Sequence, residues 1–177
     1  IESFLSELPE NVVLAQINQT QLTPVEFLQA LLVEFEIRPY QMKKVELLAR
    51  IKDFMLETYA AGKTLLLVVD EAQNLSRRVL EAIRMLSGIE AQKEKLLRIV
   101  LAGQPELATK LDSPALEQLS QRVRLRFHLS ALSKRETREY IEHRLEVAGA
   151  KHRNLVEEGA FETVFRYTGG VPRLINV

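Results

Sequence analysis

The feature that most constrains the fold is a short apolar run at residues 64–69, which shows no alternation of apolar and polar side chains. A strand of this kind is typical of a parallel sheet that is covered on both faces. Similar runs at residues 12–17 and 97–102 are separated from it by stretches with helical periodicity. Because strands joined through helices must cross over the sheet, the sequence predicts an α/β fold, with a parallel sheet flanked by helices on both faces.

Helices are predicted where a capping residue precedes an amphipathic stretch. Thr23 is followed by Pro24 and Glu26, which make a capping box with proline at the first helical position. Ser76 and Ser133 stand at the start of two further helices. Other helices are expected at residues 44–60, 106–111, 114–121 and 157–167.

The segment 123–129 differs from the other predicted strands because its side chains alternate. Apolar residues at 123, 125, 127 and 129 are interleaved with Arg124, Arg126 and His128. Alternation indicates one buried and one exposed face, so the segment is predicted to be a strand at the edge of the sheet. No further strand follows it. We therefore expect an α/β core at residues 1–132 and a helical subdomain at residues 133–177.

Composition excludes several classes of protein. The chain has no cysteine, which rules out a disulfide framework and a thiolate metal site. Its longest apolar run, at residues 65–69, is too short to cross a bilayer. With 24 basic and 24 acidic residues, there is no overall field to attract nucleic acid or an anionic membrane. The charge is uneven along the chain, because residues 76–177 carry 18 basic and 13 acidic residues.

In open parallel sheets, ligands gather beyond the carboxyl ends of the strands. This rule selects Asp70 and Glu71 after the central apolar run, and Gly103 and Gln104 after the next one. Two consecutive acids in such a position can hold a hydrated Mg²⁺ with one carboxylate and polarise a water molecule with the other. On these residues alone, a loop cap or an ion pair with an arginine is the alternative role for either acid.

Four motifs together resemble one known family. They are DEAQNL at residues 70–75, GQPEL at 103–107, QRV at 121–123 and GGVPRLIN at 169–176. In this order and spacing, over nearly the whole chain, they resemble the AAA+ ATPases of the general secretion pathway protein A (ExeA-like) family. The resemblance implies a sheet of the P-loop NTPase type, followed by a partial helical lid subdomain.

The resemblance also implies roles for the residues at the carboxyl ends of the strands. Asp70 looks like the Walker B aspartate, which holds Mg²⁺ through water, and Glu71 looks like the glutamate that orients and polarises the attacking water. Gln104 looks like sensor 1, placed to bridge that water and the γ-phosphate, with a loop-capping amide as the alternative. The implied cofactors are ATP and Mg²⁺.

Two arginine roles follow from the same resemblance. Arg122 is the best match to an arginine finger offered in trans to the nucleotide of the adjacent subunit, an element worth roughly 10³ to 10⁵ in rate. Arg124 and Arg126 compete with it for that role, and the alternative for each is a surface or salt-bridge residue. Arg173 looks like sensor 2 at the start of a lid helix, where its guanidinium and the positive end of the helix dipole can both face phosphate. Its alternative role is a helix-terminal arginine in solvent.

The glycine-rich phosphate loop of this fold, G-x-x-x-x-G-K-[ST], is absent from the 177 residues. We therefore expect the chain to be an excerpt that begins just downstream of the first strand and this Walker A loop, and that breaks off within the lid. Without the loop, the piece as given should bind ATP weakly or not at all and be inactive. The intact protein is expected to be a Mg²⁺-dependent ATPase.

The function implied by the resemblance is ATP hydrolysis at subunit interfaces, which drives or regulates the assembly of cell-envelope secretion or export machinery. The expected partners are further copies of the protein, in a ring or filament, and components of that machinery, and the expected location is the cytoplasm or the cytoplasmic face of the bacterial inner membrane. One alternative is a DNA-handling AAA+ ATPase of the transposition target-selection or initiator type. The basic second half favours it slightly, and the neutral total charge opposes it. A non-catalytic scaffold is the other alternative.

Overall fold

The computed structural model describes residues 5–150 and 155–177, and the chain divides into two compact units, residues 1–126 and residues 127–177. The division falls inside the segment 123–129, for which a strand was predicted. The first unit contains β1 (Val12–Ile17), α2 (Pro24–Glu34), α3 (Lys44–Ala60), β2 (Thr64–Val69), the 3₁₀ turn η1 (Ala72–Asn74), α4 (Arg77–Leu86), β3 (Glu90–Ala91), β4 (Glu94–Lys95), β5 (Leu97–Leu101), α5 (Glu106–Leu111), the 3₁₀ turn η2 (Pro114–Leu116) and α6 (Glu117–Ser120). The second unit contains α7 (Lys134–Val147), α8 (Glu158–Thr168) and α9 (Pro172–Ile175).

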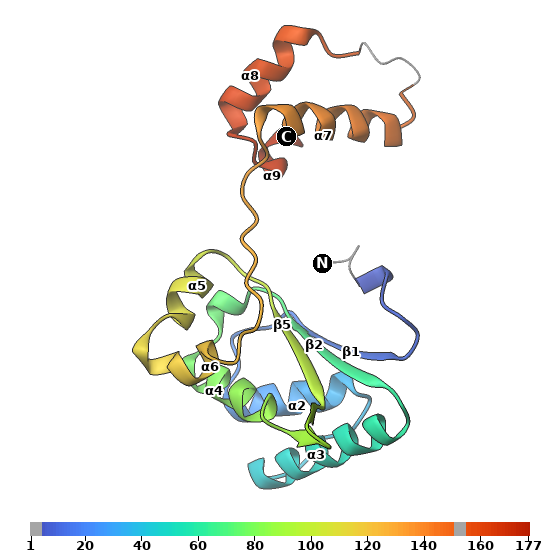
Figure 1. The fold of residues 1–177 in the computed structure, drawn as a ribbon, viewed down its shortest axis with the longest axis vertical. Helices are drawn as coiled ribbons and strands as arrows, with labels where there is room; N and C mark the ends of the chain where they lie inside the picture. Colours follow the sequence, from blue (N-terminus) through green and yellow to red (C-terminus); the bar gives the residue numbers. More distant parts are fainter. Residues whose placement is uncertain (1–4, 151–154) are drawn as a thin grey trace. The chain divides into compact units, whose positions relative to one another are not determined.

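Three parallel strands form the main sheet of the first unit, in the order β1-β2-β5 (Figure 1). The central strand is β2, and its residues from Leu65 to Val69 are buried. This confirms the parallel sheet predicted from the non-alternating run. Ile17, Val69 and Leu101 are in register, so the three strands end at the same level. The segments that follow them are therefore brought to one end of the sheet.

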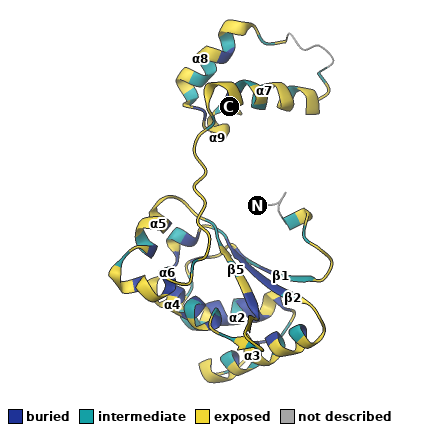
Figure 2. Ribbon diagram, in the orientation of Figure 1, coloured by how far each residue is buried: buried dark blue, intermediate teal, exposed yellow. Residues whose placement is uncertain are grey.

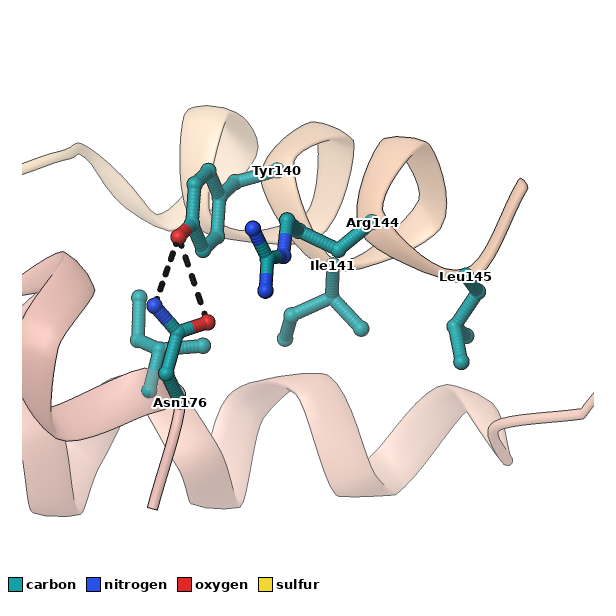
Figure 3. Close-up of a pocket in the computed structure, with 6 residues that line it drawn as sticks. Tyr140, Ile141, Arg144, Leu145 and Asn176 are labelled. Carbon is teal, nitrogen blue, oxygen red and sulfur yellow. Dashed lines mark hydrogen bonds between the residues drawn. The ribbon is translucent and has the colours of Figure 1, made fainter. Parts of the chain in front are cut away.

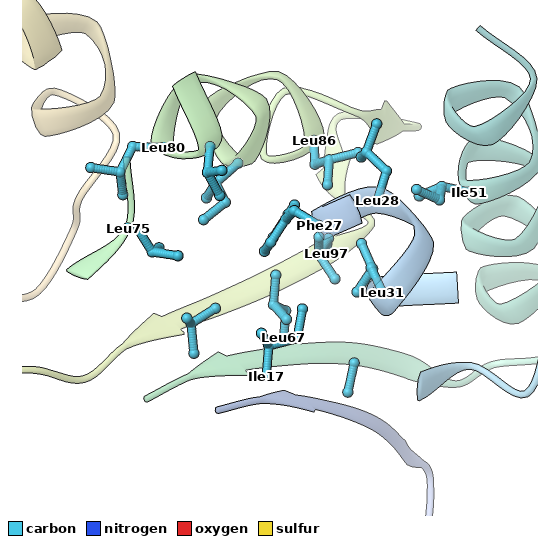
Figure 4. Close-up of a cluster of buried hydrophobic side chains, with 14 of the residues drawn as sticks. Ile17, Phe27, Leu28, Leu31, Ile51, Leu67, Leu75, Leu80, Leu86 and Leu97 are labelled. Carbon is cyan, nitrogen blue, oxygen red and sulfur yellow. The ribbon is translucent and has the colours of Figure 1, made fainter. Parts of the chain in front are cut away.

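Helices α2, α3 and α4 lie on one side of this sheet and form the hydrophobic core with it (Figures 1 and 4). The sequence predicted helices on both faces, but these three helices cover only one. The cluster includes Phe27 and Leu31 of α2, Ile51 of α3, Leu80 of α4 and Leu67 of β2, all completely buried. Figure 2 shows the buried residues of this unit on β2 and on the inner sides of the helices. Each such side chain stabilises the fold by roughly 1.5–3 kcal/mol relative to exposure, so the core fixes β2 firmly in the middle of the unit.

The predicted helix starts are confirmed at their capping residues. Thr23 Oγ1 accepts the N–H of Glu26 at 3.3 Å, and the Glu26 carboxylate accepts the N–H of Thr23 at 2.7 Å, which completes the capping box. Hydrogen bonds with Thr23 lower the pKa of Glu26, and the bond from the backbone N–H of Thr23 has the largest effect. At the start of α4, Ser76 Oγ accepts the N–H of Val79 at 3.3 Å. A short polar side chain therefore sets where each of these helices begins.

The strand predicted at residues 123–129 is wrong, because the structure has no strand there. Leu125, Phe127 and Leu129 are 74%, 85% and 95% exposed. Alternation indicates only which residues would share a face. A strand also needs a neighbour that completes its hydrogen-bond ladder, and none of the described strands pairs with this segment.

The antiparallel hairpin β3–β4 was not predicted. Its strands have only two residues each, and its turn is formed by Gln92 and Lys93, whose φ angles are 50° and 70°. Turns of this kind are usually signalled by Asn-Gly or Asp-Gly. The sequence shows neither pair here, which is why the hairpin left no recognisable signal.

The second unit is helical, as predicted. Ser133 caps α7, because Ser133 Oγ accepts the N–H of Glu136 at 3.3 Å and the Glu136 carboxylate accepts the N–H of Ser133 at 2.8 Å. Helix α8 ends at Thr168 and is capped by Gly169, where φ is 57°, and Gly170 follows with a φ of 75°. The N–H of Leu132 donates to the carbonyl of Gly170 at 2.9 Å. A Cβ on Gly170 would lie 1.9 Å from the Leu132 oxygen, so only glycine fits this position.

We expect Gly170→Ala to destabilise the second unit by roughly 2 kcal/mol or more, because it adds left-handed strain and a clash with backbone. Gly159→Ala is the matched control, since Gly159 lies in α8 with open space around its Cβ position. That change should be neutral or stabilising by up to about 1 kcal/mol. Amide hydrogen exchange of α7 and α8 would report the difference, and equal protection in the two variants would contradict it.

Candidate functional site

The two acids that follow β2 lie at the carboxyl end of the sheet. Asp70 is half-buried, and its Oδ1 accepts the N–H of Glu71 at 2.8 Å. Glu71 is exposed and has a φ of 52°, in the left-handed region that few residues other than glycine adopt. Such a conformation persists only where its surroundings fix it, and it is often found at functional sites. Here the bond to Asp70 and the turn η1 lie on either side of Glu71.

The pairing of β2 with β5 continues past the ends of both strands. The N–H of Ala102 donates to the carbonyl of Val69 at 2.9 Å, and the N–H of Ala72 donates to the carbonyl of Ala102 at 2.8 Å. The turn after β2 and the loop after β5 are therefore held side by side. This places Gln104, which belongs to that loop, next to the turn that carries the acids.

The carboxamide of Gln73 lies between Glu71 and Gln104. Its Oε1 accepts the backbone N–H of Gln104 at 3.1 Å, and its Nε2 donates to Oε2 of Glu71 at 2.6 Å. Gly103 packs against it so closely that a Cβ would lie 2.5 Å from Gln73 Oε1. The structure thus brings Glu71 and the Gln104 backbone together through Gln73, a residue of the motif at 70–75 for which the sequence predicts no role.

Lys110 is a second residue that the sequence analysis missed. It lies on α5, and its Nζ donates to the backbone carbonyls of Gln73 and Leu75, the latter at 3.1 Å. Its acceptors are at least 35 residues away along the chain, so no local pattern could have indicated the contact. The turn after β2 is fixed by a cation on its backbone.

Arg122 is bonded to the carboxyl end of α4. Its Nη1 donates to the carbonyl of Arg84 at 3.1 Å and to Oγ of Ser87 at 3.2 Å. The last carbonyls of a helix have no partner within the helix, and this guanidinium supplies one. Gly88 leaves room for it, since a Cβ there would lie 2.8 Å from Arg122 Nη1. Arg122 is therefore oriented by α4 while the residue stays exposed.

The two arginines that compete with Arg122 are in different states. Arg126 donates to Oδ1 of Asp112 at 2.6 Å and to Oγ of Ser120 at 2.7 Å. Arg124 is exposed and makes no side-chain hydrogen bond or ion pair with any residue that the structure describes. Arg122 is thus bonded to a helix end and Arg126 is in an ion pair. Arg124 has no side-chain partner among the described residues.

Arg173 belongs to the second unit, where it is the second residue of α9. Pro172 precedes it at the first helical position, which proline favours. Arg173 is exposed, and its guanidinium has no partner within residues 5–150 and 155–177. It is available for an anion, and its role as sensor 2 stays a prediction.

The second unit also contains a hollow of about 270 Å³ (Figure 3). It lies between α7 and the residues at 175–176, and Arg144 is its charged lining residue. Tyr140 and Asn176 exchange two hydrogen bonds there, at 2.9 and 3.2 Å. None of the residues with a predicted nucleotide role lines this hollow, so we do not take it as the candidate site.

The acids of the site fit a metal ion that arrives with a nucleotide. No group of three or more His, Asp or Glu side chains in the described part of the chain could hold a metal ion by itself. Asp70 offers one carboxylate, and one of its oxygens is already bonded to the N–H of Glu71. Since Mg²⁺ commonly binds one or two carboxylates and completes its shell with water and substrate phosphates, a single carboxylate of this kind fits such a site.

Comparisons with known proteins identify the family. The AAA domain family matches residues 1–111. General secretion pathway protein A of Aeromonas hydrophila is 41% identical over 176 residues, which cover 98% of this chain and 32% of that protein. The chain thus spans about a third of the length of this relative.

Solved structures agree on the fold. The ADP form of the ORC2 protein of Aeropyrum pernix matches 98% of this chain and 48% of its own, with a TM-score of 0.60 and 18% identity. Cdc6p of Pyrobaculum aerophilum matches 82% of this chain and 38% of its own, with a TM-score of 0.55 and 17% identity. At these identities the likeness concerns the fold alone. From its sequence match, this chain belongs to the AAA domain family.

Proposed function

We propose that this chain is the ATP-hydrolysing part of a secretion-associated AAA ATPase. The observation that carries the proposal is the pair Asp70 and Glu71 at the carboxyl end of the central strand, held beside Gln104 by the extended pairing of β2 and β5. The family match and the likeness to a structure in an ADP form support nucleotide as the ligand.

In this proposal, Asp70 binds a Mg²⁺ ion through water, and Glu71 orients and polarises the attacking water. Gln104 contacts the γ-phosphate from the neighbouring loop, and Arg173 contacts phosphate from the second unit. When bound, Mg²⁺ would neutralise part of the negative charge of the phosphates. The 177 residues contain no glycine-rich phosphate loop, so the experiments below use the full-length protein.

The proposed partners follow from the similarity to general secretion pathway protein A. We infer that the protein self-associates and that hydrolysis drives or regulates the assembly of cell-envelope secretion or export machinery. Among the described residues, no helix is both long and apolar enough to span a bilayer.

We expect Glu71→Gln to lower ATP hydrolysis by at least about 100-fold, because the amide cannot polarise water as the carboxylate does. ATP affinity should be nearly unchanged, since Glu71 is proposed to act on water and not on the phosphates. Phosphate release and binding of a fluorescent ATP analogue measure the two effects. Glu94→Gln removes an acid from the exposed hairpin and is the control. Wild-type turnover in Glu71→Gln would remove Glu71 from the mechanism.

A second prediction concerns Arg122 as a finger offered to the neighbouring subunit. The hydrolysis rate per protomer should rise with protein concentration, and Arg122→Ala should abolish that rise, lowering the rate at high concentration by about 10³-fold or more. The measurement is a rate series from dilute to concentrated protein.

Two further variants separate this role from the contact of Arg122 with α4. Ser87→Ala removes one acceptor of the guanidinium and leaves the arginine in place, so it should retain the concentration dependence. If Arg124→Ala abolishes the rise and Arg122→Ala does not, the finger is Arg124 and the assignment to Arg122 is wrong.

A further inference from the structure

The side chain of Gln73 uses both ends of its carboxamide. Its oxygen accepts the backbone N–H of Gln104, and its nitrogen donates to the carboxylate of Glu71 at 2.6 Å. A backbone N–H can only donate and a carboxylate can only accept. The orientation of the amide is therefore fixed by its two neighbours, and glutamine satisfies both at once.

The surroundings of Gln73 hold it in this position. Lys110 donates to its carbonyl oxygen, and the N–H of Ala72 is bonded to Ala102. Gly103 approaches so closely that a Cβ would lie 2.5 Å from Gln73 Oε1 and 3.1 Å from its backbone nitrogen. A shift of the loop at Gly103 and Gln104 toward Gln73 would therefore displace the Gln73 side chain, and with it the hydrogen bond to Glu71.

The bond to Gln73 makes the two oxygens of the Glu71 carboxylate unequal. Oε2 accepts the amide of Gln73, whereas Oε1 accepts from no described residue and offers both of its lone pairs to water. Glu71 is already confined at the backbone by its φ of 52° and by the bond of its N–H to Asp70. These backbone constraints do not set the direction of the carboxylate. The hydrogen bond from Gln73 does.

We propose that Gln73 is a positioning residue, which holds the Glu71 carboxylate in a fixed relation to the loop that carries Gln104. The acid that orients water and the loop that contacts the γ-phosphate then move together, so a change at the phosphate reaches the carboxylate. This role rests on the proposed ATP hydrolysis.

The test in the full-length protein begins with Gln73→Glu, which keeps the size of the side chain and replaces only the donor. The new carboxylate still accepts the N–H of Gln104 but faces Glu71 with a like charge. We expect hydrolysis in a single turnover to fall by about 10- to 100-fold, as for other small misplacements of a catalytic group, while ATP affinity changes little. Gln92→Glu adds the same charge on the exposed hairpin turn and should leave the rate unchanged.

A stability measurement tests the contact without depending on catalysis. Gln73→Glu should lower the melting temperature in the nucleotide-free protein. The reciprocal double variant, Glu71→Gln with Gln73→Glu, should restore it, because Gln at 71 can donate to Glu at 73, which still accepts from Gln104. Additive effects of the two changes would overturn the contact.

The outcomes separate the two proposals. A wild-type protein that never hydrolyses ATP, at any concentration, overturns the proposed function and the catalytic consequence of Gln73 with it. Wild-type turnover that is unchanged in Gln73→Glu overturns only the positioning role. A slower single turnover at unchanged affinity, together with rescue of the melting temperature by the double variant, supports it.

Discussion

The parallel pairing of β2 with its neighbours is the interaction on which the candidate site depends. The ladder does not stop at the last strand residues, since the N–H of Asp70 donates to Ile17 and the N–H of Ala72 donates to Ala102. Each of these bonds satisfies a backbone group that would otherwise lack a partner beside the core. The acids and the Gln104 loop therefore meet because backbone hydrogen bonds extend past the strands. The hydrophobic core contributes by fixing β2 in the centre of the sheet.

The parts of the fold that the sequence predicted are those determined by local chemistry. The run at 64–69 could be assigned to a central strand because a strand buried on both faces has no polar position to alternate with. Thr23 and Ser133 could be assigned to helix starts because a capping side chain bonds only three residues ahead. For the same reason Asp70 and Glu71 could be placed at the end of the sheet, since they directly follow a strand whose end was evident.

The parts that were missed depend on groups far apart in the sequence. The alternation at 123–129 was read as a strand, but strand formation requires a partner, and alternation carries no information about one. Lys110 donates to backbone carbonyls, which every residue has. The sequence around Gln73 therefore cannot indicate that Lys110 binds there. Gln73 was visible within its motif, yet its role follows only when Gln104 is known to lie beside it.

The arginines show why spacing alone could not choose a finger. Arg122, Arg124 and Arg126 are alternate residues of one segment, and the sequence gives all three the same charge and a similar context. They differ in what each meets: the end of α4 for Arg122, Asp112 for Arg126 and no described residue for Arg124.

The bonds of Arg122 are compatible with the role between subunits that we propose for it. Its acceptors are a carbonyl and a hydroxyl of half-buried residues, but Arg122 itself is exposed, so solvent weakens these bonds. Arg126, in contrast, is already neutralised by a carboxylate. A charged phosphate is a stronger acceptor for a guanidinium than either of the groups that Arg122 now contacts. The contact with α4 and the space left by Gly88 limit the directions open to the side chain before any partner arrives. Less rotamer freedom is then lost on binding, which favours Arg122 over the unbonded Arg124.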